Sequence, residues 1–385
     1  MKQNKKSTMK KITYILAIIF SLFIISCNTA DFQNTEKNSS KIIVGVYTGN
    51  GASAICILET LEALKIDTGI AGKEISSADI MGGELDNIDV LIFPGGSGSK
   101  ELNNLGDFGL KKVHDFVKNQ GKGIVGICAG GYILSTTPNY PSLKLLDAYN
   151  FDRAHYARGR GLIEFQITNY EIFPELKDKK TFIQYYDGPI LVPIDSNNIK
   201  YNEVAKYTTD IHSNKGIPTG ITPGKTFMLT QNVGKGMIFT IGGHPESTPG
   251  MRWIVPRMAR YVHSQEIIPY PEKWIKPEIN SDEIMFTSEL KKVERKLWWK
   301  LSNDTAQVQI NAMQELFKLR SRPAVRWTIG LLRDDNPKVR KQAAIILMKT
   351  EYTWALKDVL QAIENEEYED VKIELEKTAD FLSTF

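Results

Sequence analysis

Five segments of the N-terminal part indicate the fold class: KIIVGVYTG (41–49), ASAICILETLEALK (52–65), DVLIFPGG (89–96), FGLKKVHDFVKNQ (108–120) and GIVGICAGG (123–131). Short β-branched runs alternate here with segments whose apolar residues recur at helical spacing, which predicts strand, helix, strand, helix, strand. Strands that are joined through helices pair in parallel, and the helices then cover both faces of the sheet. We therefore expect an α/β domain with a parallel sheet.

Glycine marks the extent of this domain, because 28 of the 29 glycines lie between Gly45 and Gly250. We place the domain at residues 41–265. The following IIPYPEKWIKPEI (267–279) contains three prolines, which interrupt a helix. Residues 266–284 are therefore expected to form a proline-rich linker. Residues 285–385 have an almost purely helical pattern, which predicts a small all-α domain.

The N-terminus has the pattern of an export signal. Several lysines precede an apolar run at residues 12–26, which is shorter than the roughly 20 residues that a membrane-spanning helix needs. The run ends in Ile-Ile-Ser-Cys, which resembles a bacterial lipobox, and in that family the cysteine, here Cys27, becomes the lipidated N-terminus. We expect a signal peptide at 1–26, a polar tether at 27–40, and a membrane-anchored lipoprotein on the periplasmic or cell-surface side. An uncleaved N-terminal anchor is the alternative.

Charge and cysteine content exclude several classes of function. Lys and Arg total 48 against 45 for Asp and Glu, a net charge of +3 with no dominant basic block, so nucleic acid is not expected as a partner. Three cysteines cannot form a disulfide framework, and the sequence has no CxxC pair or HExxH string that offers a metal site. We expect neither a metal nor a cofactor.

The C-terminal region has a weak internal repeat with a period of 31 residues. Apolar residues four apart carry it, at Val308, Ala312 and Leu316 and again at Val339, Ala343 and Leu347, with a fainter copy from Val371. At the same offset, a second helix carries Ala324, Val325 and Ile329 and then Ala355, Leu356 and Leu360. The pattern resembles HEAT-type repeats, whose apolar faces are buried only by stacking. We expect this HEAT-like region to pack on the first domain or on a protein partner; a generic helical bundle is the alternative.

The string Gly126-Ile127-Cys128-Ala129-Gly130-Gly131 is the first candidate for chemistry, because parallel sheets place their sites where strands end. A nucleophile at a sharp strand-to-helix turn needs small neighbours, since its backbone is strained and its side chain must project from the turn. A helix N-terminus also favours the thiolate of a cysteine. We therefore expect Cys128 to be an exposed nucleophile at the carboxyl edge of the sheet.

Two further strands end in glycine-rich turns. Gly242-Gly243-His244-Pro245-Glu246 follows the apolar run GKGMIFTI, so His244 can serve as the base for a thiol while Glu246 orients its imidazole. The PGGSG string at 94–98 follows DVLIF, and amides of Gly95 and Gly96 are expected to form an oxyanion hole with that of Ala129.

The strings PGGSG, GICAGG and GGHPE together resemble the class I glutamine amidotransferase-like superfamily, a flavodoxin-like α/β fold with a Cys-His-Glu triad. More narrowly, they and VYTGNGAS (46–53) and YYDGPI (185–190) resemble the N-terminal domain of biotin-protein ligases. The resemblance covers roughly residues 41–265. It implies Cys128 as nucleophile, His244 as base and Glu246 as its orienter. Biotin transfer is not implied, because the catalytic domain of the ligase is missing.

Other polar residues have simpler interpretations. Cys56 lies between two isoleucines and is expected to be a buried packing thiol. Tyr185, Tyr186 and Asp187 follow a predicted strand, TFIQ, and are expected to wall the substrate pocket. A basic group formed by Arg153, His155, Arg158 and Arg160 suits a carboxylate, although an exposed basic loop is the favoured interpretation. His114 is expected to be solvated, and His263 to interact with a helix C-terminus.

The sequence therefore predicts a lipid-anchored, extracytoplasmic thiol hydrolase that acts on a small amide or peptide substrate. Ammonia transfer from glutamine is not favoured, because the chain contains no synthase domain. The competing hypothesis is a binding or scaffold module that retains the fold without turnover, since fold resemblance alone cannot separate the two.

Overall fold

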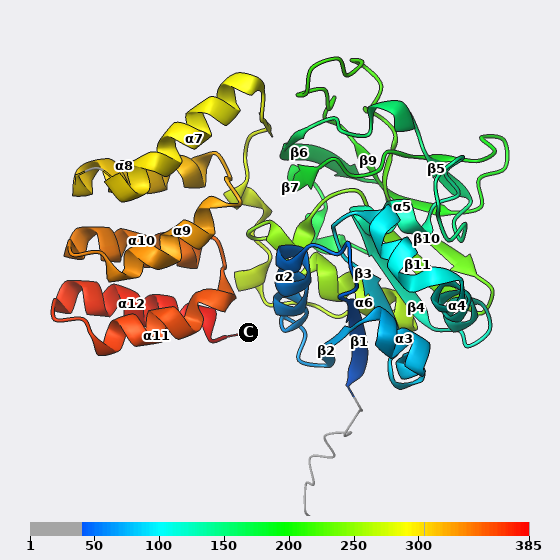
Figure 1. Cartoon of the computed structure of the whole chain (residues 1–385), viewed down its shortest axis with the longest axis horizontal. Helices are drawn as coiled ribbons and strands as arrows, with labels where there is room; N and C mark the ends of the chain where they lie inside the picture. The colour runs from blue at the N-terminus through cyan, green and yellow to red at the C-terminus, as the bar shows by residue number, and fades with distance from the viewer. Residues whose placement is uncertain (1–40, 304, 385) are drawn as a thin grey trace, which may run out of the picture. The chain divides into compact units, whose positions relative to one another are not determined.

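A computed structural model describes residues 41–303 and 305–384 of the chain (Figure 1). The predicted signal peptide (1–26), Cys27 and the tether (27–40) lie outside the described residues, so they stay predictions. In the described part of the chain, no helix combines the length and apolar character needed to cross a membrane.

The described residues form twelve strands and eleven α-helices. The strands are β1 (Ile42–Tyr47), β2 (Ile70–Ile75), β3 (Val90–Phe93), β4 (Gly123–Ile127), β5 (Ala148–Asn150), β6 (Arg160–Ile167), β7 (Thr181–Tyr186), β8 (Leu191–Pro193), β9 (Asn202–Tyr207), β10 (Thr226–Val233), β11 (Gly236–Ile241) and β12 (Ile284–Met285). The helices are α2 (Ala54–Leu64), α3 (Ser77–Gly82), α4 (Gly98–Lys118), α5 (Ala129–Leu134), α6 (Ile254–Ser264), α7 (Ser288–Asn303), α8 (Ala306–Lys318), α9 (Ala324–Gly330), α10 (Pro337–Lys349), α11 (Leu356–Glu364) and α12 (Glu369–Leu382).

The centre of the sheet is parallel, in the order β2-β1-β3-β4-β11. All four residues of β3 and all five of β4 are buried, as expected for strands that are covered on both faces. Alternate residues of β3 enter different cores: Val90 and Ile92 join a cluster with Met258 of α6, whereas Leu91 and Phe93 join a cluster with Phe116 of α4. The predicted α/β class, with a flavodoxin-like strand order and helices on both faces, is confirmed.

The remainder of the sheet is antiparallel, which the expectation of a parallel sheet did not include. Strands β6, β9 and β10 continue the sheet beyond β11, and every pairing among them is antiparallel. The physical reason is the connection between strands, because a parallel pair needs a crossover of a dozen or more residues, usually a helix. Between α5 and α6 the strands are connected by loops and short 3-10 turns and not by α-helices, so neighbouring strands there reverse direction.

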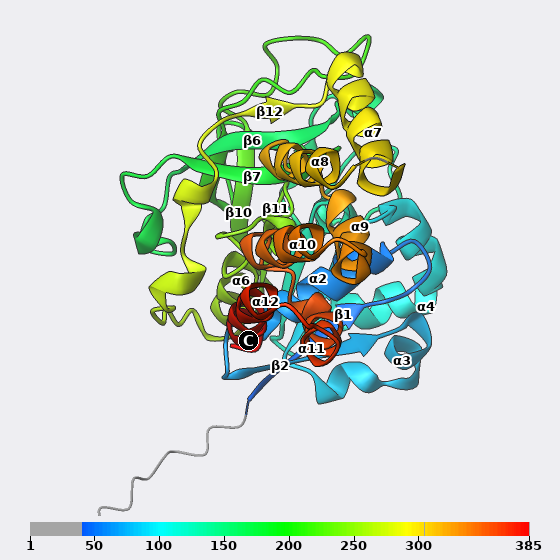
Figure 2. The ribbon, with the colours of Figure 1, turned by 90° about the vertical axis from the view of Figure 1, so that its left-hand side faces the viewer.

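Helices α8, α10 and α12 of the C-terminal region contact one another in succession (Figures 1 and 2). The predicted period is present, since α8 begins at Ala306 and α10 at Pro337. Ala312, Leu316, Val339, Ala343, Leu347 and Val371 are all buried in a single apolar cluster. Leu360 differs from its expected place in the repeat, because its side chain is 49% exposed. The assignment to the HEAT type stays a prediction.

The helical region is docked on the α/β core by polar contacts. Arg160 of β6 forms an ion pair with Glu294 of α7. The hydroxyl of Thr353 donates to Glu62 of α2 at 2.6 Å. The segment at 266–284, expected as a linker, also packs on the core, since the exposed fraction of Trp274 is only 2%. The helical region and the α/β domain are therefore in direct contact with each other.

Candidate active site

Cys128 lies between β4 and α5 with φ 51° and ψ −101°, a backbone conformation that non-glycine residues rarely adopt. Its neighbours have to be small. A Cβ on Gly126 would lie 2.8 Å from the carbonyl carbon of Gly130, and one on Gly130 would lie 2.4 Å from the oxygen of Phe93. The turn thus has the strained backbone and the neighbouring glycines that are expected of a nucleophile at a strand-to-helix turn. The thiol is not exposed as expected, however: Cys128 is 6% exposed, and its Sγ lies 3.4 Å from the main-chain oxygen of Tyr186.

His244 follows β11 and is buried, with 3% of its surface exposed. Its amide donates to the oxygen of Gln184 at 2.7 Å, which joins the turn to β7. Its Nδ1 donates to Oε1 of Glu246 at 2.7 Å. Since Nδ1 is used in this way, Nε2 is the ring nitrogen left for a thiol.

The charges of this group support one another. Burial lowers the pKa of His244, but the negative charges of Cys128 and Glu246 outweigh burial and hold that pKa well above its ordinary value. Burial raises the pKa of Glu246, but His244 and the guanidinium of Arg322 outweigh it, so the net shift is downward. A protonated imidazole between a cysteine and a carboxylate is the arrangement that a thiol nucleophile requires.

The predicted oxyanion-hole residues divide into two kinds. Gly96 and Ala129 lie with Cys128 on the wall of an open groove of about 900 Å³. Gly95 lies against the base instead, because a Cβ there would be 2.6 Å from Cε1 of His244 and 2.8 Å from Sγ of Cys56. Gly95 is therefore needed for the close packing of His244 and Cys56. The role of Gly96 and Ala129 as amide donors stays a prediction.

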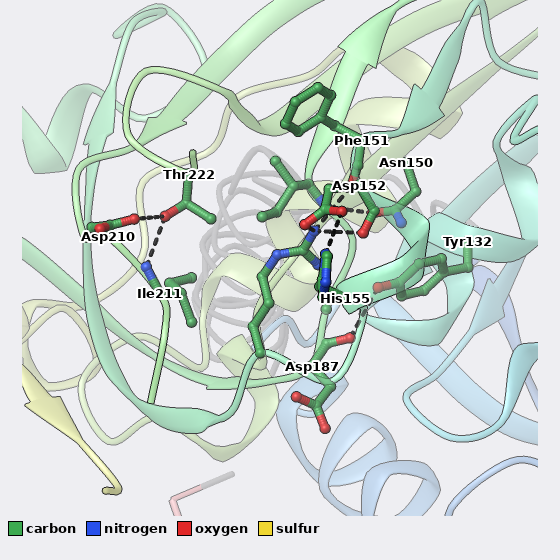
Figure 3. A network of polar contacts seen from close by, with 12 residues as sticks. Tyr132, Asn150, Phe151, Asp152, His155, Asp187, Asp210, Ile211 and Thr222 are labelled. Atoms are coloured by element: carbon green, nitrogen blue, oxygen red, sulfur yellow. Dashed lines mark hydrogen bonds and ion pairs between the residues drawn. The ribbon is translucent and has the colours of Figure 1, made fainter. Parts of the chain in front are cut away.

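Of the three predicted pocket residues, Tyr186 and Asp187 line the groove. Tyr186 is 56% exposed. Asp187 has a φ of 49°, and its carboxylate accepts a hydrogen bond from the amide of Gly159 at 2.7 Å. Tyr132 of α5 donates to the main-chain oxygen of Asp187 at 3.1 Å (Figure 3). Tyr185 is buried, and its hydroxyl donates to the oxygen of Gly188. It lines a second, smaller cavity beside Cys128.

The favoured interpretation of the basic group as an exposed loop is wrong for Arg158. Its side chain is fully buried, and Nη2 donates to the main-chain oxygens of Phe151 at 3.0 Å and Asp152 at 2.9 Å, in the network of Figure 3. His155 bonds the carboxylate of Asp152 at 2.7 Å. His114 is half-buried rather than solvated, and burial lowers its pKa.

Two residues have a setting that the sequence did not indicate: Cys56 lies beside His244, and Arg322 lies beside Cys56 and Glu246. Cys56 of α2 is buried as expected, at 3% exposed, but it is more than a packing thiol. Arg322, from the connection between α8 and α9, places Nη2 3.5 Å from Sγ of Cys56 and 3.7 Å from Oε1 of Glu246, and it is also paired with Glu59. Burial raises the pKa of Cys56, but Arg322 and His244 outweigh it and lower the pKa.

Cys56, His244 and Glu246 place one ligand atom each within 4.8 Å of one another, a set of sulfur, nitrogen and oxygen donors that suits zinc. The guanidinium of Arg322 contacts two of these three groups. The positive charge of Arg322 repels a metal cation from this position. The arrangement therefore favours ion pairing among these side chains over a metal centre.

Glu101, in the first turn of α4, is a third residue whose setting the sequence did not indicate. It is fully buried, and neither carboxylate oxygen has a hydrogen-bond partner among the described residues. Burial, with a smaller contribution from Cys56, raises its pKa to about 8. A Cβ on Gly96 would lie 2.8 Å from its Oε1, so this carboxyl group lies directly behind the glycine loop.

Comparison with known proteins supports the domain assignment for part of the chain. Residues 42–143 match the family described as "Biotin-protein ligase, N terminal". The chain is 30% identical over 106 residues to the biotin–protein ligase of Schizosaccharomyces pombe, which amounts to 25% of this chain and spans only 15% of that protein. The predicted resemblance to this N-terminal domain is therefore confirmed over that segment.

Solved structures with a similar arrangement include a glutamine amidotransferase from Thermotoga maritima, at 14% identity and a TM-score of 0.39, covering 73% of this chain and 94% of that one. Another is a β-galactosidase from Bacillus circulans, at 14% identity and a TM-score of 0.34, covering 58% of this chain and 31% of that one. With TM-scores this low, the assignment of fold rests on the strand order described above.

Proposed function

We propose that this protein is a thiol hydrolase that cleaves an amide or peptide bond through Cys128, His244 and Glu246. The observation that supports this most directly is the position of His244. Its Nδ1 is bonded to Glu246, and the charge of Cys128 contributes to its raised pKa. A histidine between a carboxylate and a cysteine is the arrangement that activates a thiol for acyl transfer.

In this mechanism the thiolate of Cys128 attacks the carbonyl carbon of the substrate. Amides of Gly96 and Ala129 stabilise the negative oxygen that develops. His244 donates its proton to the leaving amine, and the acyl group stays on Sγ as a thioester. Water then attacks the thioester, His244 takes the proton of the water, and the thiolate is released.

The proposal includes anchoring at a membrane through a lipid on Cys27, on the periplasmic or cell-surface side. The lysines, the short apolar run and the Ile-Ile-Ser-Cys string at 24–27 support it. Stable attachment requires more than one acyl chain, as bacterial lipoproteins carry.

Alkylation by iodoacetamide tests the triad. We expect Cys128 to react faster than a model thiol below about pH 8.5, the range where free cysteine is mostly protonated. His244→Ala should slow the reaction strongly, because the imidazolium cation is lost. Glu246→Gln should slow it less, because the main-chain hydrogen bond from His244 to Gln184 still holds the histidine in place. Since Cys56 lies beside the same histidine, the labelled peptide has to be mapped, and Cys56→Ala serves as the control.

Two results would contradict the proposal. Labelling of Cys128 no faster than a model thiol, with or without His244, would exclude an activated nucleophile. Fast labelling without acyl-enzyme formation on any member of a broad amide and peptide panel would favour the binding or scaffold module instead. If turnover is present, His244→Ala should lower it by about 10²–10⁴-fold, the usual contribution of a general base.

A further inference from the structure

Cys128 lies on a wall that two separate spaces share. One is the open groove of about 900 Å³, and the other is a smaller cavity of about 330 Å³. Gly96 and Tyr186 also line both spaces, whereas His244 lines only the smaller cavity. A substrate whose carbonyl carbon reaches Sγ can therefore extend in two directions that differ in chemistry.

The position of His244 decides which part of the substrate occupies which space. In acyl transfer to a thiol, the acyl part remains bonded to sulfur, and the leaving amine receives a proton from the histidine. The proton can reach the amine only on the side where His244 lies. The leaving amine consequently belongs in the smaller cavity, and the acyl part belongs in the groove.

Apart from Cys56, Cys128 and His244, which belong to the reacting group, the charged side chains that line the smaller cavity are all cationic. They are Arg160, Arg320 and Arg322, and no carboxylate side chain of the described residues lines it. Arg160 is already paired with Glu294 through both terminal nitrogens. The side chain of Arg320 donates only to neutral oxygens, those of Asn280, Phe317 and Ile279.

Arg322 keeps a donor for a ligand. It uses Nε and Nη2 for Glu59, and its Nη1 has no hydrogen-bond partner within the described part of the chain. Its side chain is still 22% exposed. A guanidinium nitrogen that lacks a partner can recognise a carboxylate through a charge-assisted hydrogen bond.

We propose that the leaving amine carries a free carboxylate, so that the protein acts as a carboxypeptidase that removes the C-terminal residue of a short peptide. This inference rests on the proposed thiol hydrolase activity and adds its substrate class. The size of the cavity agrees with it, because about 330 Å³ is at the lower end of small-molecule sites. The groove is larger and is lined by Tyr132, Tyr140, Tyr156 and Tyr186, which suits a longer acyl part.

The atoms balance with water as the only co-reactant. The Sγ–C bond forms as the thiolate adds to the last peptide carbonyl, and the C–N bond breaks as His244 protonates the departing nitrogen. The C-terminal amino acid leaves with its carboxylate intact. Water then supplies OH to the acyl carbon and a proton to His244, which gives the shortened peptide and restores the thiolate.

The test compares peptide pairs that differ only in a free C-terminal carboxylate or a C-terminal amide, with the full chain and mass spectrometry as the readout. We expect loss of a single C-terminal residue, with kcat/KM about tenfold to a hundredfold higher for the free acid, the range of a charge-assisted hydrogen bond. Arg322→Gln should reduce this ratio toward one, and Arg322→Lys should retain part of it. Arg333→Gln, on the same helical region but 61% exposed and paired with Asp358, is the matched control and should leave the ratio unchanged.

The ratio of kcat/KM for the acid and amide peptides distinguishes recognition of the carboxylate from activation of the thiol. Because Arg322 also contacts Glu246, its loss can slow both peptides, but only loss of carboxylate recognition changes their ratio. Equal rates for acid and amide in the unsubstituted protein would overturn the inference, and so would release of fragments longer than one residue. If one of these results is found and an acyl-enzyme still forms on Cys128, only the carboxypeptidase inference fails and the hydrolase proposal is retained. If no acyl-enzyme forms and Cys128 is not labelled rapidly, the hydrolase proposal fails too.

Discussion

Replacing Glu101 by Gln should stabilise the protein at neutral and alkaline pH. Glu101 is fully buried, and its carboxylate oxygens have no hydrogen-bond partner among the described residues. An ionised carboxylate is costly in such a place, and the protein avoids the cost by keeping the group protonated. Glutamine has nearly the same shape and no charge at any pH, so it removes the titration without opening a cavity.

The magnitude follows from the pKa. Burial, with a smaller contribution from Cys56, raises the pKa of Glu101 from 4.5 to about 8. Between these values the folded protein binds one more proton than the unfolded chain, so the free energy of unfolding falls as the pH rises. The fall is about 1.36 kcal/mol per pH unit, or about 5 kcal/mol over the whole interval as an upper limit. Below about pH 4.5 both states are protonated, and the variant should gain nothing.

The assay is denaturant unfolding of the protein and of Glu101→Gln at a series of pH values from 4.5 to 9. The difference in unfolding free energy should start near zero and grow with pH until about pH 8, because only the unsubstituted protein has to ionise a buried carboxyl group. Glu74→Gln, at an exposed position of β2, is the matched control and should follow the unsubstituted protein. A difference that is independent of pH, or that shrinks as the pH rises, would refute the reasoning.

Three more outcomes are expected. Leu347→Ala, at a fully buried position of the helical stack, should cost about 2–5 kcal/mol in the free energy of unfolding, whereas Leu360→Ala, at a half-exposed position, should stay within about 0.5 kcal/mol; equal effects would contradict the stacking described above. Removal of residues 285–385 should lower the melting temperature of the remaining domain, because it uncovers Glu62 and the surface around it; an unchanged melt would indicate an independent tail. Cys27→Ala should abolish lipid labelling and leave the precursor unprocessed, and residues 1–26 found intact on the unsubstituted protein would rule out the signal peptide.

The candidate triad was accessible from the sequence because each of its members depends on a local signal. Glycines on both sides of Cys128 indicate a strained turn, and the structure gives that residue a φ of 51°. His244 and Glu246 are two residues apart, so a single turn can hold them in contact, and their side chains are 2.7 Å apart. The three strings end strands of one parallel sheet, and such strands end at the same edge.

Cys56 was misjudged because its setting is not local. Its two isoleucine neighbours correctly indicated burial, yet the charges that lower its pKa come from elsewhere in the chain. Arg322 is 266 residues away in the sequence, in a turn between helices whose pattern indicated only packing. No sequence signal distinguishes that arginine from the exposed ones around it.

The alternation of strands and helices in residues 41–131, the helical period of the C-terminal region and the three turns that carry Cys128, Gly96 and His244 could be predicted from the sequence. These depend on periodicity and on backbone conformations that few residues tolerate, and both can be read within a window of a few residues. The tertiary fold, by contrast, sets the antiparallel direction of β6, β9 and β10, the burial of Glu101 without a hydrogen-bond partner among the described residues, and the contact of Arg322 with Glu246. These features depend on which surfaces exclude water from each other, and that is settled by packing between segments distant in the chain.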